Sequence, residues 1–322
     1  MRALAAVLPA LALLAGLPAA SAPVDEALAW LEKVSNSARQ TTYAGTVLHV
    51  AGDRASASRI THLFIGGVEH ERIEWLDGPR REIVRRNDEL QCFYPDEKTI
   101  RMDKRVSARF FPSLLTGAPA TIAESYRLRL GKVERVAGQE CQWIHLEPRD
   151  MLRYAQRLCA ELASGLLLRA RTLGPKGEVL EQYTFTDLRL GPLVSRSELK
   201  SVFHAQSKDW RRDSQPLDDA RPVNTGWAVD KLPSGFSLVG EMFKKFPNRP
   251  HPVSQLVYTD GLATMSVFVE PMPTPPRAAE SLDGEGDLSI FARPMGDSLV
   301  TVIGEVPPAA AQQVGRSVSR RP

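Results

Sequence analysis

The sequence predicts a mainly β protein of the α+β class with two domains of unequal size. Short strand-like runs recur through most of the chain at intervals of about 8–12 residues, separated by Gly, Asn, Asp and Pro turns. Helical periodicity is confined to two stretches, 25–40 and 308–318. A polar, charged stretch at 205–222 divides the strand-rich region and predicts a linker between a large domain, 23–204, and a small domain, 223–322.

Residues 1–22 have the layout of a secretory signal peptide. Arg2 precedes an apolar run, and small residues end the run at Ala22. Pro9, Gly16 and Pro18 interrupt the run, which makes it a poor membrane span; a membrane anchor is the less favoured alternative. We therefore expect an exported protein, cleaved near Ala22, that works away from ATP, NAD and the chromosome.

The charge balance argues against a nucleic-acid partner. The chain has 41 Lys and Arg against 38 Asp and Glu, whereas nucleic-acid binding requires a basic face that releases counterions. After residue 22 no run of 18 or more apolar residues follows, so the sequence predicts a soluble mature protein.

The large domain is predicted to begin with a helix and continue as a meander. Leu28, Leu31 and Val34 recur at spacing three in the helix 25–40, whose first turn is acidic. Strands are then expected at 41–50, 59–65, 70–76, 81–86, 90–95 and 98–102. A second set is expected at 126–138, 139–150, 151–162, 166–174 and 179–191.

An apolar segment at 106–123 separates the two sets of strands. Pro112 and the Gly-Ala-Pro run at 117–119 prevent a long helix there. We expect a short helix or a flap over the sheet. In the small domain, strands flank a turn at 258–261, and 272–287 reads as an exposed loop.

The three cysteines are Cys92, Cys141 and Cys159. In an exported protein an odd number predicts one disulfide with one free thiol, or no disulfide. Cys141 and Cys159 lie at equal distances from the centre of a predicted hairpin near Asp150. They form the favoured pair.

No local motif indicates catalysis or a cofactor. The chain contains no G-x-S-x-G, P-loop or G-x-G-x-x-G sequence. No two histidines have i,i+4 spacing on a predicted helix; His62 and His70 flank one hairpin, but no third metal ligand is evident. We expect no catalytic residue, metal or cofactor, although paired carboxylates far apart in sequence leave hydrolysis as a less favoured alternative.

Two groups of side chains on the first meander are candidates for binding. Its apolar residues suit either a filled core or, if the sheet is strongly curved, an apolar cavity. Its basic residues suit either a solvated sheet face or a patch for anionic lipid head groups or an acidic partner. The residues concerned are Ile73, Trp75 and Phe93 for the first group and Arg80, Arg81, Arg85 and Arg86 for the second.

Five strings, in order along nearly the whole mature chain, resemble the MucB/RseB family, periplasmic regulators of the envelope-stress sigma factor. They are EWLDGPRREIVRRNDELQCFYPDEKTI (74–100), LEPRDMLRYAQRLCAELASGLLLRARTLGPKGEVLEQYTFTDLRLG (146–191), LPSGFSLVGE (232–241), VYTDGLATMSVFVEP (257–271) and TVIGEVP (301–307). The resemblance implies a large domain shaped as a half-open, LolA/LolB-like antiparallel β-barrel whose concave face is covered by helices. It implies a smaller C-terminal domain that is mainly a sheet.

The resemblance also implies a function. The family binds the periplasmic domain of a single-pass anti-sigma factor and shields it from the site-1 protease. Lipopolysaccharide or lipoprotein acyl chains in the cavity loosen that complex. A lipoprotein carrier of the LolA/LolB type is the alternative, and homo-oligomers are compatible with the sequence.

These implications lead to two predictions about sites. We expect acyl chains beneath the segment 106–123, in contact with Phe110, Phe111, Leu114 and Leu115. We expect the small domain and the side facing the linker to hold the anti-sigma factor.

Overall fold

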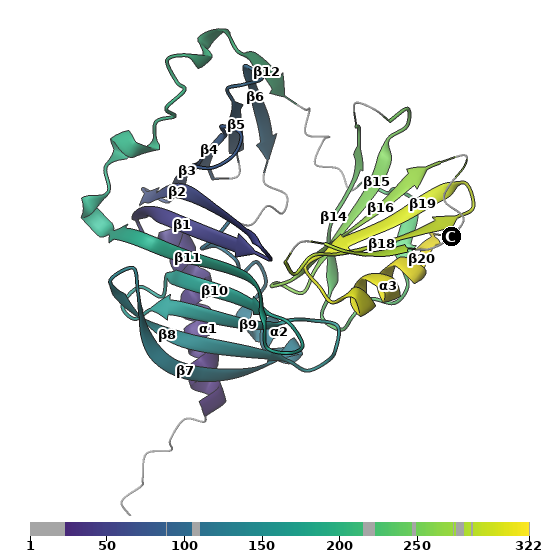
Figure 1. Cartoon of the computed structure of the whole chain (residues 1–322), viewed down its shortest axis with the longest axis horizontal. Helices are drawn as coiled ribbons and strands as arrows, with labels where there is room; N and C mark the ends of the chain where they lie inside the picture. The colour runs from purple at the N-terminus through teal and green to yellow at the C-terminus, as the bar shows by residue number, and fades with distance from the viewer. Residues whose placement is uncertain are drawn as a thin grey trace, which may run out of the picture.

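The computed structural model describes residues 23–87, 89–104, 110–214, 223–246, 249–272, 274, 280–284 and 286–321. The predicted signal peptide, 1–22, lies outside the described residues. The described chain forms one twelve-stranded sheet, one six-stranded sheet and a two-stranded ribbon (Figure 1). Strands thus dominate both domains, as the sequence predicts. No described helix is long and apolar enough to cross a membrane.

The large sheet is a half-open, curved antiparallel sheet whose two end strands do not pair with each other. Its order is β12-β6-β5-β4-β3-β2-β1-β11-β10-β9-β8-β7, and only the β12–β6 pair is parallel. The strands are β1 (Tyr43–Ala51), β2 (Arg54–Ile65), β3 (Val68–Trp75), β4 (Glu82–Arg86), β5 (Glu89–Tyr94), β6 (Thr99–Lys104), β7 (Tyr126–Val136), β8 (Gln139–Pro148), β9 (Ala155–Glu161), β10 (Leu167–Leu173), β11 (Val179–Leu190) and β12 (Arg211–Ser214). The predicted strand 151–162 is shorter than expected, because residues 149–154 form the connection between β8 and β9.

Helix α1 (Pro23–Gln40) packs on the concave face of this sheet, behind β7–β11 in Figure 1. In its apolar stripe Leu31 and Val34 are buried, at 0% and 2% exposure, and Leu28 is partly buried. Leu31 joins Tyr43, Ile144 and Leu158 in one core. Burial of a leucine side chain contributes about 1.5–3 kcal/mol, so this stripe holds the helix against the sheet.

The predicted flap is an extended segment followed by a short helix, α2 (Pro119–Ser125), which has proline at its first position. Phe111, Leu115 and Ile122 are buried in the same core as α1. The segment therefore covers part of the concave face, as the sequence predicts. Residues 105–109 lie outside the described residues.

After β11 the chain crosses the convex face of β1–β6 before it reaches β12 (Figure 1). Three short 3-10 helices lie along this segment: η1 (Gly191–Leu193), η2 (Arg196–Leu199) and η3 (Ser207–Asp209). Glu82 accepts a hydrogen bond of 2.5 Å from Ser201 Oγ. In the first part of the predicted linker, Trp210 packs with Phe93 and Phe203, and β12 pairs with β6. Residues 205–214 therefore belong to the large domain, and 215–222 lies outside the described residues.

The small domain has a sheet of order β14-β15-β16-β19-β18-β17, covered on one face by α3 (Pro308–Arg316) (Figure 1). Its strands are β14 (Ser237–Lys244), β15 (Val253–Thr259), β16 (Thr264–Pro271), β17 (Glu280–Asp283), β18 (Ser289–Met295) and β19 (Ser298–Gly304). A ribbon of β13 (Trp227–Val229) and β20 (Val318–Arg320) completes the domain. The prediction of an exposed loop at 272–287 is wrong in part, because β17 lies within that range and pairs with β18.

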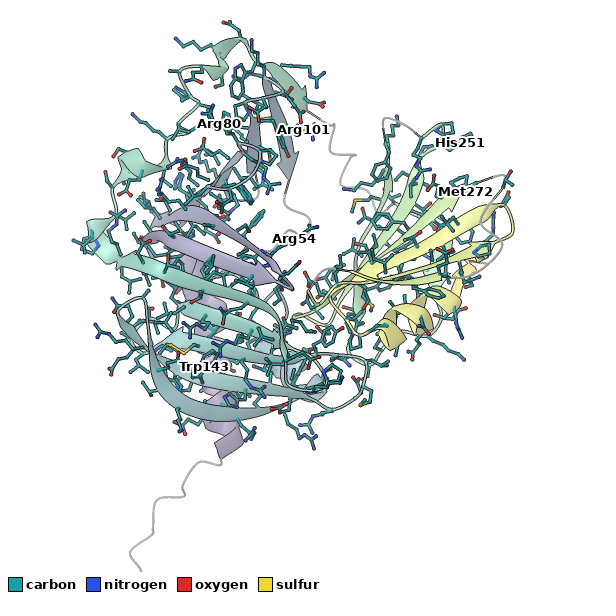
Figure 2. All side chains as sticks on the ribbon, viewed as in Figure 1. Arg54, Arg80, Arg101, Trp143, His251 and Met272 are labelled. Atoms are coloured by element: carbon teal, nitrogen blue, oxygen red, sulfur yellow. A yellow bond between two sulfur atoms is a disulfide. The ribbon has the colours of Figure 1, made fainter. Side chains whose placement is uncertain are left out.

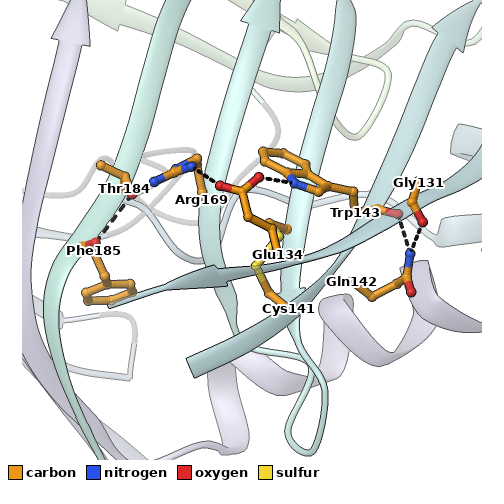
Figure 3. Close-up of a disulfide and its surroundings, with 9 residues drawn as sticks. Gly131, Glu134, Cys141, Gln142, Trp143, Arg169, Thr184 and Phe185 are labelled. Carbon is orange, nitrogen blue, oxygen red and sulfur yellow. Dashed lines mark hydrogen bonds and ion pairs between the residues drawn. A yellow bond between two sulfur atoms is a disulfide. The ribbon is translucent and has the colours of Figure 1, made fainter. Parts of the chain in front are cut away.

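A disulfide joins Cys141 of β8 to Cys159 of β9, the pair that the sequence favours (Figure 3). In the register of the two strands Cys141 is opposite Glu161, and Trp143 is opposite Cys159. The two cysteines are therefore diagonal neighbours on one face of the sheet, with their Cα atoms 5.3 Å apart. Cys92 is not part of this disulfide.

Candidate functional site

A cavity of about 230 Å³ lies between the concave face of the large sheet and the flap. Strands β1, β2, β3 and β11 supply its floor, and Phe110 and Phe111 of the flap form its roof. The lining residues are Val47, His49, Ser56, Ser58, Ile60, Ile73, Trp75, Phe110, Phe111 and Tyr183. The lining is largely apolar and aromatic with a few polar groups, which suits an apolar ligand with one polar end.

Stacked rings connect the roof of this flap cavity to its floor. The ring of Phe111 stacks on Tyr183 with centroids 5.6 Å apart, and Tyr183 stacks on His49 at 4.2 Å. Phe110 meets the edge of Trp75 at 6.5 Å. These contacts fix the flap over the cavity, so a ligand must displace them or enter beside them.

Two side chains that line the flap cavity, His49 and Tyr183, meet at the carboxylate of Glu181 beside it. His49 Nε2 lies 2.7 Å from Glu181 Oε1, and the Tyr183 hydroxyl donates a 3.1 Å hydrogen bond to the same carboxylate. Burial and the charge of Glu181 raise the pKa of Tyr183 well above its usual range, so the hydroxyl stays protonated. The sequence gave no sign that His49, Tyr183 and Glu181 meet, because β1 and β11 are far apart in the chain and pair only in the sheet.

The structure brings four of the seven predicted apolar ligand residues into the flap cavity: Ile73, Trp75, Phe110 and Phe111. Leu114 lines a different, smaller cavity, and Leu115 is buried in the core. Phe93 faces the convex side of the sheet, where it packs with Ile100 and Phe203. Its prediction as a cavity residue is wrong, because successive residues of β5 point to opposite faces and Cys92 occupies the concave one.

The four arginines of the predicted basic patch do not form one surface. Arg81 stacks on Trp75 at 3.7 Å from the ring centroid, and Arg80 lies over Phe203 at 4.9 Å. Arg86 is exposed at the end of β4. Figure 2 shows Arg80 and Arg101 together in the upper part of the large domain.

Arg85 is buried, with 4% of its side chain exposed, and contacts two carboxylates. Its Nε atom is 2.9 Å from Glu71 and its Nη1 atom is 2.7 Å from Glu69. Because these acids already neutralise the guanidinium, Arg85 is not available to an anionic head group. Its prediction as a head-group residue is wrong for this reason.

The two histidines considered as metal ligands lie on opposite faces of the sheet. His62 lies opposite Glu71, and the next residue of the strand, Leu63, lies opposite His70. Because consecutive residues of a strand point to opposite faces, His62 and His70 are on different faces. His62 is fully buried, and burial lowers its pKa. Among the described residues no group of three His, Cys, Asp or Glu side chains has the arrangement of a metal site.

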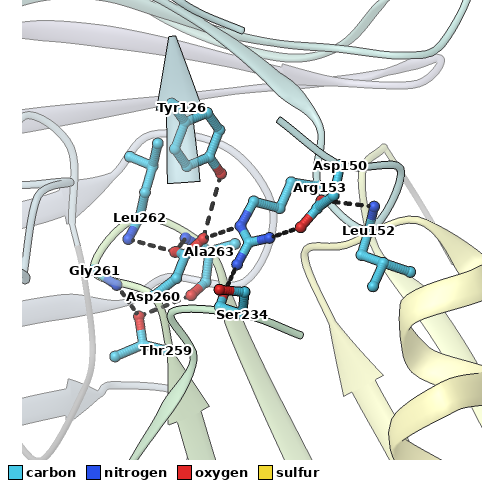
Figure 4. A network of polar contacts seen from close by, with 10 residues as sticks. All are labelled: Tyr126, Asp150, Leu152, Arg153, Ser234, Thr259, Asp260, Gly261, Leu262 and Ala263. Atoms are coloured by element: carbon cyan, nitrogen blue, oxygen red, sulfur yellow. Dashed lines mark hydrogen bonds and ion pairs between the residues drawn. The ribbon is translucent and has the colours of Figure 1, made fainter. Parts of the chain in front are cut away.

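A buried ion pair joins the two domains (Figure 4). Arg153, in the connection between β8 and β9, places its Nε atom 2.8 Å from Asp260 Oδ2 in the β15–β16 turn. The Arg153 guanidinium also donates to the carbonyl of Ser234 and contacts Asp150. Tyr126 donates to Asp260 at 3.4 Å. The sequence pattern predicted a strand at Arg153 and gave no sign of this contact, because its partner lies in the other domain.

Two glycines allow the backbones of the domains to touch beside this pair. Gly117 and Thr116 of the flap donate backbone hydrogen bonds of 3.3 and 3.0 Å to the carbonyl of Gly261. A Cβ atom at Gly117 would lie 2.6 Å from the Cα of Gly261. The flap therefore contacts both the cavity below it and the small domain beside it.

A smaller cavity of about 70 Å³ at the domain interface contains three carboxylates. Glu181 belongs to the large domain, while Asp287 and Glu305 belong to the small one. Burial, followed by the charges of Glu181 and Glu305, raises the pKa of Asp287 to about 8. Thr172 of β10 forms a hydrogen bond with Asp287. The charge at this interface thus depends on pH, although the sequence showed only scattered acids.

Comparison with family models identifies both domains. Residues 26–203 match the MucB/RseB N-terminal domain, and residues 221–319 match the MucB/RseB C-terminal domain. The sigma factor AlgU regulatory protein MucB of Pseudomonas aeruginosa is 30% identical over 294 residues, covering 90% of this chain and 89% of that protein. The sigma-E factor regulatory protein RseB of Salmonella typhimurium is 24% identical over 305 residues, covering 94% and 93%.

Solved structures agree over the same length. The crystal structure of MucB in complex with MucA(peri) matches with a TM-score of 0.74 at 29% identity, covering 92% of this chain and 99% of that one. The crystal structure of MucB alone matches with a TM-score of 0.65 at 28% identity, covering 92% and 98%.

Proposed function

Because the chain belongs to the MucB/RseB family, we propose that it is a periplasmic negative regulator of sigma-E type signalling. In this role it binds the periplasmic domain of a membrane anti-sigma factor and protects that domain from site-1 proteolysis. The observation that carries the proposal is the match, across both domains, to a MucB structure solved with the periplasmic part of MucA. Export by the predicted signal peptide would place this chain beside such a partner.

The edge strand β14 of the small domain is the surface that we propose for the anti-sigma factor. Among the described residues β14 pairs with β15 alone, so its other edge is open to a further strand. Leu238, Val239 and Phe243 on this strand are each more than 40% exposed. Two exposed lysines, Lys244 and Lys245, follow them. Such an edge suits an extended apolar segment with acidic residues.

The flap cavity supports the proposed lipid signal. An acyl chain that enters beneath Phe110 and Phe111 must move rings that fix the flap, and the flap contacts Gly261 of the small domain. A lipid can release the partner only if it binds the released arrangement more tightly than the bound one. The flap supplies a physical connection between the two sites.

Partner binding is tested with the full mature chain and the periplasmic domain of an anti-sigma factor. Val239→Asp and Phe243→Asp place charges on the β14 edge and should weaken binding at least about tenfold, since apolar contacts at an interface centre dominate affinity. Leu193→Asp is the matched control, because Leu193 is 70% exposed on the large domain. Absence of any binding by the unaltered chain would refute the proposed function, and equal loss in the control would refute the surface.

Lipid binding is tested with a fluorescent fatty acid. Phe111→Asp should abolish binding in the flap cavity, and Ser58→Ala, which alters a small polar residue of the lining, should change it little. Protection of the anti-sigma factor from the protease is then measured with and without lipid. Unchanged lipid binding by Phe111→Asp would show that the acyl chain lies elsewhere.

A further inference from the structure

A second, larger groove lies on the opposite face of the large sheet from the flap cavity. In the strand register Tyr183, Ala170 and Leu158 are neighbours on the concave face, toward α1 and the flap. The residues that alternate with them, Arg157 and Arg171, therefore face outward. They line an open groove of about 820 Å³ that runs across β7–β11. We call it the outer groove.

A bulge in β7 shapes the outer groove. The register shifts between Leu130 and Val133, and Gly131 lies inside the bulge. A Cβ atom at position 131 would lie 2.5 Å from His145 Nε2, so only glycine lets β7 come this close to β8. Beyond the bulge, Glu134 accepts hydrogen bonds of 2.7 Å from the Trp143 indole and 2.6 Å from Arg169 (Figure 3). These bonds hold β7 over the sheet as a wall.

The outer groove carries an excess of positive charge. Four cations, Arg129, Lys132, Arg157 and Arg171, line it together with a single carboxylate, that of Glu134. Arg129 and Arg157 share Glu147 at 3.5 and 2.6 Å, and Glu134 is already bound to Arg169.

Two of these cations lack an acidic partner. Among the described residues neither Lys132 nor Arg171 contacts a carboxylate. Arg171 donates to the neutral Gln182 and lies over the Trp143 ring at 5.3 Å. Burial and the neighbouring Arg169 lower the pKa of Arg171. An anion bound beside Lys132 and Arg171 would supply the charge that the protein does not.

Apolar side chains extend the groove away from these cations. Val133 is 51% exposed and Val179 is 50% exposed, although both lie on strands. Leu130 and Leu173 continue the apolar lining. We propose that the outer groove binds an anionic amphiphile, with its charged head group against Lys132 and Arg171 and its chain along the valines and leucines. This chemistry differs from that of the flap cavity, whose described lining contains no Lys or Arg.

The outer groove and the small cavity at the domain interface lie on opposite faces of β10. Arg171 faces the outer groove, and its neighbour Thr172 faces the cavity that contains Glu181, Asp287 and Glu305. A signalling role for a lipid in the outer groove rests on the proposed function, in which a lipid releases the partner.

Three probes separate the parts of the ligand: a monoacyl glycerophosphate, the uncharged monoacylglycerol and free glycerophosphate. Each is titrated calorimetrically, below its micelle concentration, against the full mature chain. The monoacyl glycerophosphate should bind most tightly. Lys132→Gln with Arg171→Gln should weaken its binding at least about tenfold, because two charge-assisted contacts are lost. Arg80→Gln with Arg101→Gln, in the upper part of the large domain, is the matched control.

The outcomes distinguish the outer groove from the flap cavity. If Lys132→Gln with Arg171→Gln binds the glycerophosphate lipid normally while Phe111→Asp does not, the outer groove is refuted and the flap site stands. Equal weakening by the control pair would mean nonspecific attraction and would also refute the groove.

Discussion

Arg153 of the large domain and Asp260 of the small domain form an ion pair that is almost completely removed from solvent. Their side chains are 0% and 1% exposed, and Nε and Oδ2 are 2.8 Å apart. Asp260 also accepts backbone hydrogen bonds from Leu262 and Ala263 at 2.9 and 2.8 Å (Figure 4). The carboxylate therefore orders the β15–β16 turn and joins that turn to the other domain.

Removal of this carboxylate should be costly. Asp260→Ala removes the buried partner of the Arg153 guanidinium and leaves it only the partly exposed carboxylate of Asp150. Breaking a buried pair in this way typically costs about 3–5 kcal/mol. Glu97→Ala removes the exposed Glu97–Arg101 pair and is the control, with an expected loss below about 1 kcal/mol. Urea unfolding of both variants measures the difference. Similar losses in the two variants would contradict a special role for the interdomain pair.

Replacement of Arg85 should destabilise the protein much more than replacement of its neighbour Arg86. Arg85→Ala leaves Glu69 and Glu71 facing each other without their shared cation, and we expect a loss of about 3–5 kcal/mol in the free energy of unfolding. Arg86→Ala removes an exposed side chain and should cost less than about 0.5 kcal/mol. Thermal unfolding compares the two. A stable Arg85→Ala variant that lost lipid binding would instead restore Arg85 as a head-group residue.

The free energy of unfolding should fall as the pH rises from about 4 to about 8, because of the titration of Asp287. In the folded protein Asp287 keeps its proton until about pH 8, whereas its ordinary pKa is 3.8. Between these values the folded state binds a proton that the unfolded state has lost, so rising pH favours unfolding. Glu181, Glu305, Thr172 and Tyr183 line the same cavity, and the charges of Glu181 and Glu305 act on Asp287.

Asp287→Asn should flatten this pH dependence and raise stability near pH 8. Asp297→Asn is the control, since Asp297 is 81% exposed. Urea unfolding at a series of pH values checks both variants. An unchanged slope in Asp287→Asn would mean that Asp287 does not titrate in this range.

Loss of the disulfide should weaken the large domain. Cys141 and Cys159 are 18 residues apart, and closure of a loop of this size stabilises a protein by about 3 kcal/mol. We expect that loss for Cys141→Ser with Cys159→Ser, measured by urea unfolding. Cys92→Ser is the control and should cost less. Reductant should lower the stability of the unaltered chain by a similar amount and leave the double variant unchanged.

The sequence determined the elements of this protein, because they follow from local patterns. Spacing of Leu28, Leu31 and Val34 predicted α1, and period-two alternation with glycine turns predicted the meander. Pro112 and Gly117 predicted a broken flap rather than a long helix. Ordered strings such as 232–241 indicated the family, and equal distance from a hairpin centre indicated the disulfide.

The tertiary structure decided which side chains act together, because that depends on register and on contacts between distant strands. Phe93 faces the convex side since alternation assigns Cys92 to the concave one. Arg85 is neutralised because Glu71 lies opposite it on β3 and Glu69 lies two residues away on the same strand. Asp260 and Arg153, 107 residues apart, meet only when the two domains pack together. A single sequence carries no local signal for such pairs, so the flap cavity was predicted in part and the domain interface was not.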